Sequence, residues 1–315
     1  MNSKSLSSEK SRGRRQPGTE LDQGKVQPDR GNDVGVVLPE LQQKAEQGDG
    51  AAACNLGDTY REGESTSQDL NLALRWYRRG AELGDANAQN NLGSMFLNGL
   101  TCERDPVQAI YWYRKSAEQG NAEAQYNLAK RYLHGDGVNQ NYAEARMWFQ
   151  KAVVQSHAWA SCELGTMYWL GQGVERNLLA AADFHLIAAE AGDELACRNL
   201  SEYRAELEQI ALSGNQIASL FLCRMCNRGF GADKSQSMTW GWISWAKKDC
   251  APDTDPQIVG EVTEAYGFYH MCVSAEDRKL GRKALAEMRK ARAKKRAAPR
   301  ADKPRNTHRD RKEEI

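Results

Sequence analysis

The chain has 315 residues, enough for one large or two ordinary domains, and its 40% hydrophobic content excludes a wholly disordered or fibrous protein. The formal net charge of +1 hides an asymmetry, since residues 39–277 carry 20 basic and 32 acidic side chains whereas residues 278–315 carry 16 and 5. Any function therefore has to accommodate an acidic body and a basic C-terminal segment.

The first segment, residues 1–37, is polar and rich in Ser, Lys and Arg, and we expect it to be a disordered leader. It lacks the apolar run of about 7 to 15 residues that forms the core of a secretory signal. No apolar run in the chain approaches the roughly 18 residues needed to cross a bilayer, so we expect no transmembrane segment. These features predict a cytoplasmic protein, with signal-independent export as an effector as the alternative.

The following region repeats with a period of 36 residues. This step separates Leu56, Leu92, Leu128, Leu164 and Leu200. Four further columns share it, one of Trp or Phe, one of Tyr or Phe, one of Gly and one of Ala. Five columns in one register predict a repeat architecture.

The pattern within each repeat predicts a pair of helices. Ala88, Leu92 and Phe96 are spaced i, i+4 and i+8, which places them on one helical face, and Gly99 follows where a left-handed stop is expected. Pro106 then opens a second helical pattern. The apolar faces of such a hairpin exceed what it can bury alone, so neighbouring hairpins must stack.

The repeats delimit a predicted solenoid at residues 38–250. A half unit, visible as a single helix, precedes the first complete one. Complete repeats are predicted at about 50–85, 86–121, 122–157 and 158–193, and a degenerate region at 194–250.

Several segments of these units resemble the Sel-1-like repeat, a relative of the tetratricopeptide repeat. They are Ala-Glu-Ala-Gln-Tyr-Asn-Leu-Ala at 122–129, the loop Gly135-Asp136-Gly137-Val138, and Ala145, Trp148 and Phe149. The resemblance implies an all-α fold, a right-handed α/α superhelical solenoid. It further implies a non-enzymatic adaptor for protein complexes, of the kind found in bacterial signalling, regulation and host interaction, without a cofactor.

Residues 251–298 are predicted to form capping and basic helices. Asp255-Pro256 is typical of a helix start, and apolar residues from Ile258 to Tyr269 form a stripe that can cover the last repeat. A second helix opens near Ser274 and becomes almost purely Arg, Lys and Ala before Pro299 ends it. We expect residues 299–315 to be a disordered basic tail.

The first helix of each repeat is expected to face the concave side of the superhelix. Asn side chains there, with donors and an acceptor, are suited to grip the backbone of an extended partner segment. The alternative is that these Asn residues bond to a neighbouring helix as part of the packing of the repeat. The predicted partner-binding residues are Asn55, Asp58, Glu62, Asn91, Ser94, Asn98, Asn127, Lys130, His134, Glu163 and Thr166.

The basic segment offers a second class of partner. Residues 278–312 carry 16 basic and three acidic side chains, which suits nucleic-acid phosphates or an anionic membrane surface. A solvated tail, or one folded back onto the acidic solenoid, is the alternative. The predicted anion-binding residues are Arg289, Lys290, Arg292, Lys294, Lys295 and Arg296.

The remaining candidate sites have simpler explanations. Cys223 and Cys226 have the spacing of a metal or redox pair, but they fall in inward-facing columns of the repeat, so buried packing explains them and we predict no metal site. The eight cysteines lack a regular disulfide spacing. Ser244 and Lys247 spell the Ser-x-x-Lys motif of a hydrolase without its partner motifs, so hydrolysis is a second alternative to the adaptor function.

Overall fold

A computed structural model of the protein contains fourteen α-helices and no strand in the residues that the structure describes, which are 34–63, 66–101, 103–231, 234–248 and 254–297. The all-α solenoid predicted from the repeats is thereby confirmed. The helices are α1 (Val34–Glu46), α2 (Gly50–Glu62), α3 (Leu70–Glu82), α4 (Ala86–Asn98), α5 (Pro106–Glu118), α6 (Ala122–His134), α7 (Tyr142–Val154), α8 (Ala158–Leu170), α9 (Leu178–Glu190), α10 (Glu194–Ala211), α11 (Gln216–Arg228), α12 (Gln236–Lys248), α13 (Pro256–Cys272) and α14 (Ala275–Ala297).

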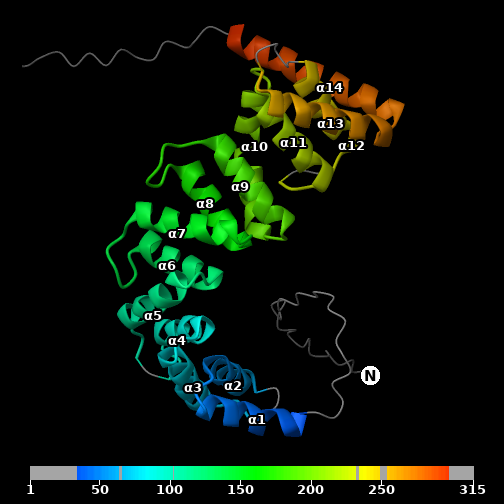
Figure 1. Cartoon of the computed structure of the whole chain (residues 1–315). Coiled ribbons are helices and arrows are strands. Elements are labelled where there is room, and N and C mark those ends of the chain that lie inside the picture. The colour runs from blue at the N-terminus through cyan, green and yellow to red at the C-terminus, as the bar shows by residue number, and fades with distance from the viewer. Residues whose placement is uncertain (1–33, 64–65, 102, 232–233, 249–253, 298–315) are drawn as a thin grey trace, which may run out of the picture.

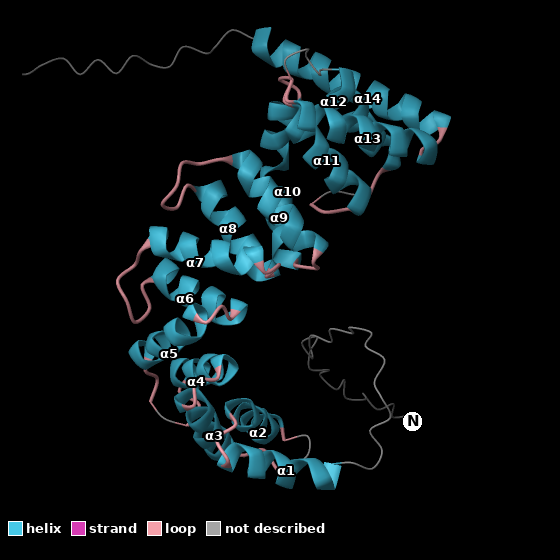
Figure 2. Ribbon diagram, viewed as in Figure 1, coloured by secondary structure: helices cyan, strands magenta, loops and turns pink. Residues whose placement is uncertain are grey.

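The helices stack as hairpins into a curved array with α1 at one end and α14 at the other (Figures 1 and 2). We call α2, α4, α6 and α8 the A helices and their partners α3, α5, α7 and α9 the B helices. In Figure 1, α2 and α4 lie on the inner side of the curve relative to α3 and α5. The exposed residues of α2 and α4 therefore lie on the inner side of the curve.

Local sequence explains where each A helix begins and ends. At the start of α4, Asp85 Oδ1 accepts a hydrogen bond from the Ala88 amide at 2.7 Å, which satisfies a donor that the first helical turn leaves open. At its end, Gly99 adopts a left-handed conformation with φ of 63°, which a side chain would strain. The other A helices end on a left-handed glycine in the same way.

The core follows the 36-residue columns. Leu56, Leu92, Leu128, Leu164 and Leu200 are all fully buried. Close packing between the helices of a hairpin also depends on small residues: a Cβ added to Gly57 would lie 2.4 Å from the ring of Tyr77 on the partner helix. The 36-residue period thus specifies both the large and the small side chains that pack between the helices.

The structure moves one expected boundary and defines the degenerate region more closely. Residues 34–37, expected in the disordered leader, belong to α1. In the degenerate region α10 has 18 residues, five more than each A helix, and it packs against both α9 and α11 instead of pairing in a hairpin. Most of the expected disordered leader, residues 1–33, and the expected tail, residues 299–315, lie outside the described residues.

The C-terminal helices cover the end of the solenoid. Val262 of α13 is buried, and Tyr266 and Tyr269 pack against the same core cluster. Helix α14 lies mainly against α12, where Gly281 meets Gly241 and Leu285 is buried. The small residues matter here, because a Cβ on Gly281 would collide with the backbone of Ser237.

Candidate functional site

The candidate site is a strip of side chains along one face of the A helices, which we call the concave strip. Its positions are spaced i, i+4, i+7 and i+11 from the second residue of each A helix, as in Ala51, Asn55, Asp58 and Glu62. This spacing places the four side chains on one helical face. Among the predicted partner-binding residues, Asn55, Glu62, Asn98 and His134 are exposed, and Asp58, Asn91, Ser94, Asn127, Lys130, Glu163 and Thr166 are half-buried.

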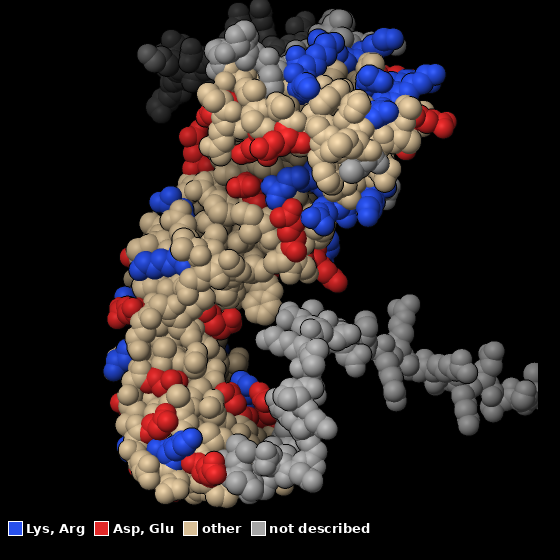
Figure 3. Space-filling model, turned by 45° about the vertical axis from the view of Figure 1, so that its right-hand side comes forward, with Lys and Arg blue, Asp and Glu red and all other residues tan. Residues whose placement is uncertain are grey.

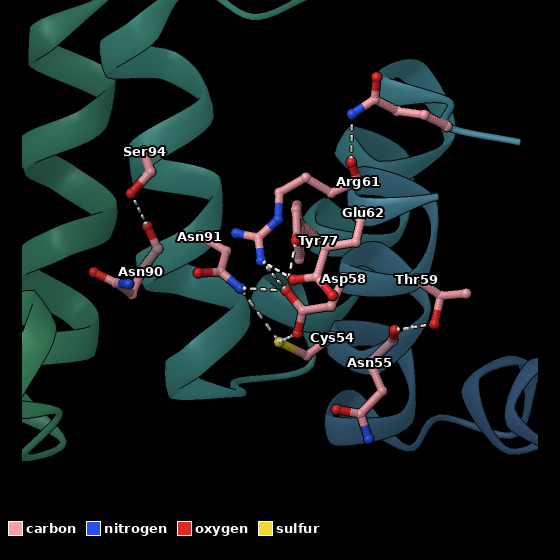
Figure 4. Close-up of polar contacts among 11 residues, drawn as sticks. Cys54, Asn55, Asp58, Thr59, Arg61, Glu62, Tyr77, Asn90, Asn91 and Ser94 are labelled. Carbon is pink, nitrogen blue, oxygen red and sulfur yellow. Dashed lines mark hydrogen bonds and ion pairs between the residues drawn. The ribbon is translucent and has the colours of Figure 1, made fainter. Parts of the chain in front are cut away.

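Asp58 is the centre of a polar network that joins the first two repeats (Figure 4). Its Oδ1 accepts hydrogen bonds from the Tyr77 hydroxyl at 2.7 Å and from Asn91 Nδ2 at 3.2 Å, and Arg61 lies 3.3 Å away. Burial and the bond to the Asp58 carboxylate raise the pKa of Tyr77, so its hydroxyl stays a donor. The network fixes Asp58 and ties α4 to α2.

Other strip residues also link neighbouring helices. Asn127 Nδ2 donates to Asn90 Oδ1 at 3.1 Å, and the hydroxyls of Ser94 and Tyr113 are 3.1 Å apart. Asn91 and Asn127 therefore make the packing bonds that formed the alternative interpretation of the Asn ladder. Asn91 Nδ2 also donates to Cys54 Sγ at 3.8 Å, which leaves its Oδ1 for a ligand, whereas Asn127 keeps an N–H donor as well as its Oδ1.

A hollow of about 290 Å³ opens between α2, α4 and α6. The carboxylates of Asp58, Asp85 and Glu123 line it, together with several Asn side chains, and no Lys or Arg does. Burial and the charges of Asp58 and Asp85 raise the pKa of Cys54, at its wall, to about 12. The thiol is thus protonated at neutral pH, and the hollow presents hydrogen-bonding groups and negative charge.

In the fourth repeat, Thr166 of the strip takes part in a network of hydrogen-bonding side chains around the buried His185. Thr166 Oγ1 lies 3.2 Å from His185 Nε2, and Asn199 Nδ2 lies 3.3 Å from the same hydroxyl. On the other side of the ring, His185 Nδ1 is 2.8 Å from the Tyr203 hydroxyl. Burial lowers the pKa of His185 to about 4, so the imidazole is neutral at physiological pH.

The strip's first column, one turn before the Asn column, was not among the predicted partner-binding residues. Asn87 and Glu123 line the hollow, and Trp159, one repeat further, is 53% exposed. Trp159 lies near the rings of Tyr126 and His157. The signal was present in the sequence, because these positions follow the same 36-residue step, four residues before Asn91, Asn127 and Glu163.

The other candidates lie away from the strip. Cys223 and Cys226 lie on α11 and are buried in the hydrophobic core. Burial raises the pKa of both thiols, that of Cys226 to about 11. Lys247 lies with its Nζ 3.8 Å from the ring centroid of Tyr266 on α13. The described part of the chain contains no group of three or more His, Cys, Asp or Glu side chains arranged to hold a metal ion.

The predicted anion-binding residues all belong to α14. Arg289 and Lys290 are exposed, and the Arg289 guanidinium carbon lies 5.1 Å from the ring centroid of Trp245. The side chains of Arg292, Lys294, Lys295 and Arg296 lie outside the described ones. Among the helices that the structure describes, none is both long and apolar enough to cross a membrane.

The repeats match a known repeat family, and the array is similar to solved structures. Residues 50–85, 86–121, 122–155 and 160–193 match the family model of the Sel1 repeat. The chain is similar to the structure of c5321, a protective antigen present in uropathogenic Escherichia coli strains, at 26% identity and a TM-score of 0.52, over 80% of this chain and 64% of that one. It is also similar to a Sel1 repeat protein from Oxalobacter formigenes, at 26% identity and a TM-score of 0.50, over 72% of this chain and all of that one. No curated protein matches.

The matched segments coincide with the hairpins α2–α3, α4–α5, α6–α7 and α8–α9. The c5321 structure displays the same SLR fold, and this chain spans about two-thirds of its length. Helices α10 to α14 lie beyond the matched repeats and extend the array. The periodic sequence, the stacked hairpins and these matches agree: residues 50–193 contain four Sel1 repeats, and the chain has the solenoid fold of Sel1 repeat proteins.

Proposed function

We propose that the protein is a non-enzymatic adaptor that binds an extended segment of a partner protein along the concave strip. Sel1 repeats are generally modules for protein–protein interaction. The observation that carries the proposal is the run of amide and carboxylate side chains on four successive A helices, with a hollow of about 290 Å³ between α2, α4 and α6. Such groups bind the peptide backbone independently of its side chains.

Site-specific photocrosslinking tests this proposal. A photoreactive phenylalanine derivative placed at Asn55 or Asn98 of the full-length chain is expected to crosslink a partner in cells. The exposed residues Val107 and Tyr111, on the B helix α5, provide matched positions on the other layer. Crosslinks from α5 and none from the strip would contradict the proposal.

A charge variant gives the complementary measurement. Asn55→Arg adds bulk and charge at an exposed strip position whose side chain makes no hydrogen bond within the described residues, and Val107→Arg makes the same addition on α5. Capture of the crosslinked partner at high salt should be lost in Asn55→Arg and retained in Val107→Arg. Capture that survives Asn55→Arg but disappears with deletion of residues 278–315 would instead assign binding to the basic segment.

A second candidate function rests on α14. Lys279, Arg282, Lys283 and Lys290 are exposed at spacing i, i+3, i+4 and i+11, on the helix face opposite Gly281 and Leu285. Figure 3 shows Lys and Arg gathered over the end of the array where α12–α14 lie. This stripe favours binding to a phosphate backbone, because it presents fixed positive charges on a rigid helix.

Salt-dependent DNA binding tests the second function. Four phosphate contacts predict a log–log slope of the affinity against salt of about −4 for a short duplex. Replacing Lys279 and Lys283 by Gln should reduce the slope by about 2, whereas the same change at Arg78 and Arg79, exposed on α3, should leave it unchanged. Equal slopes for both double variants would rule out the stripe.

A further inference from the structure

Three aromatic rings from two neighbouring repeats meet at the middle of the concave strip. Tyr126 of α6 stacks on His157 with ring centroids 4.8 Å apart, and Trp159 of α8 lies 6.0 Å from Tyr126 and 5.9 Å from His157. Trp159 is 53% exposed. The ring cluster of Tyr126, His157 and Trp159 therefore has an accessible aromatic surface on the face where a partner segment is proposed to lie.

None of the three rings recurs in the neighbouring repeats, and His157 departs from a column that otherwise holds Asp or Asn. One repeat earlier, the equivalents of Tyr126, His157 and Trp159 are Asn90, Asn121 and Glu123. In the flanking repeats, the N-cap equivalents of His157 are Asn121 and Asp193.

His157 caps α8 in place of these residues, its Nδ1 accepting from the Ala160 amide at 3.2 Å. Asn, Asp and Ser are the preferred caps, so His is an unusual choice here. Departures from a local rule concentrate at functional sites.

Negative charge borders the rings. Glu123 Oε2 lies 3.0 Å from His157 Nε2. Glu163 follows Trp159 by four residues on α8, so the two side chains lie on the same face of the helix. Burial raises the pKa of Tyr126, and the charges of Glu163 and Glu123 raise it further. Burial also raises the pKa of Glu163, although Lys130 and His134 oppose the effect. The half-buried Glu163 side chain makes no hydrogen bond within the described residues.

The ring cluster already contacts one cation of the chain. Lys130 Nζ lies 5.4 Å from the ring centroid of Tyr126, within the range of a cation–π contact. Trp, the ring that attracts cations most strongly, is the exposed member. A carboxylate border disfavours a purely apolar ligand, because docking one would desolvate Glu163 and Glu123 without compensation.

We propose that Tyr126, His157 and Trp159, with the carboxylates of Glu123 and Glu163, form a seat for a Lys or Arg side chain of the partner segment. The cation lies against the exposed Trp159 ring and pairs with Glu163. This proposal rests on the proposed adaptor function and adds the chemistry of the partner: a segment whose backbone lies along the strip and whose basic side chain enters the seat.

Selection from a display library of random 12-residue peptides tests the seat on the full-length protein. The bound peptides are expected to share a Lys or Arg at one position. Trp159→Ala should weaken the best peptide about 2- to 30-fold, the range expected from the loss of one cation–π contact. Glu163→Gln should also lower the affinity for this peptide. Replacing the basic residue of the peptide by Gln should remove the effect of both variants.

Tyr111 provides a matched control. It is 48% exposed on α5, its ring lies 5.0 Å from that of Trp112, and Lys115 Nζ lies 4.7 Å from its centroid, so it reproduces the ring pair and the cation on the other layer. Tyr111→Ala should leave the affinity unchanged. Melting curves of all variants check that the solenoid stays folded.

The outcomes separate the seat from the adaptor function. Peptides that lose binding to Asn55→Arg but need no basic residue, or bind Trp159→Ala as tightly as the native chain, overturn the seat and leave the adaptor function standing. If every selected peptide binds Asn55→Arg unchanged, both proposals fail.

Discussion

Acidification should destabilise the fourth repeat through His185. Its side chain is fully buried between Thr166 and Tyr203, and burial lowers its pKa from 6.5 to about 4. Between pH 6.5 and 4 the unfolded chain binds a proton that the folded chain excludes, so the free energy of unfolding falls as the pH falls. The neutral His185 ring makes its full contribution to the free energy of unfolding above pH 6.5. The full pKa shift corresponds to about 3 kcal/mol of this free energy, of which about 2 kcal/mol is lost by pH 5.

Urea unfolding of the native chain and of His185→Phe, at pH 7.5 and pH 5, measures this contribution. Phe is the residue that the third repeat carries in this column, at Phe149. The variant should be less stable at pH 7.5, because Tyr203 and Thr166 lose a buried partner at a cost of about 1–3 kcal/mol. Between pH 7.5 and pH 5, the free energy of unfolding of His185→Phe should fall by about 2 kcal/mol less than that of the native chain.

Repeat arrays can unfold in stages, so an NMR titration of the His185 ring complements the denaturation. Its resonances should not titrate between pH 7.5 and pH 5. A midpoint near pH 6.5, or an equal loss of stability in the native chain and in His185→Phe, would refute the argument that burial keeps this ring neutral.

Three further predictions concern the packing of the repeats. Gly57→Ala should cost about 1–3 kcal/mol in chemical denaturation, since the new Cβ would lie 2.4 Å from the Tyr77 ring. Gly260→Ala on α13, where no atom lies within 4 Å, should gain about 0.5–1 kcal/mol, and a loss of the same size at both sites would contradict the steric argument. Leu128→Ala should cost about 2–5 kcal/mol, because the side chain is fully buried. Leu170→Ala, at a side chain 55% exposed, should stay within about 0.5 kcal/mol, and similar melting temperatures for the two would count against the core assignment. Asn91→Ala should cost about 1 kcal/mol through its lost bond to Asp58, whereas Asn55→Ala should change stability by less than about 0.5 kcal/mol. Equal stabilities of these two variants would show that the Asn91 bond contributes nothing.

The candidate site was predictable in position but not in detail. The helical period identified the face of the A helices that carries Asn55, Asn91 and Asn127, because side-chain direction in a helix depends on spacing alone. It did not show that Asn91 reaches Asp58 of the preceding repeat, 33 residues away. Nor did it single out Trp159, because an exposed aromatic residue becomes informative only when its neighbours are known.

The sequence by itself determined the repeat length, the hairpins, their caps and the buried leucine columns, since these depend on contacts within one or two turns of a helix and on a regular step along the chain. The tertiary structure decided what happens between repeats: how Tyr126, His157 and Trp159 meet, and how α10 leaves the hairpin pattern. The physical reason is that side chains some 30 residues apart meet only through the rotation of one hairpin on the next, and that rotation depends on the packing of the whole interface.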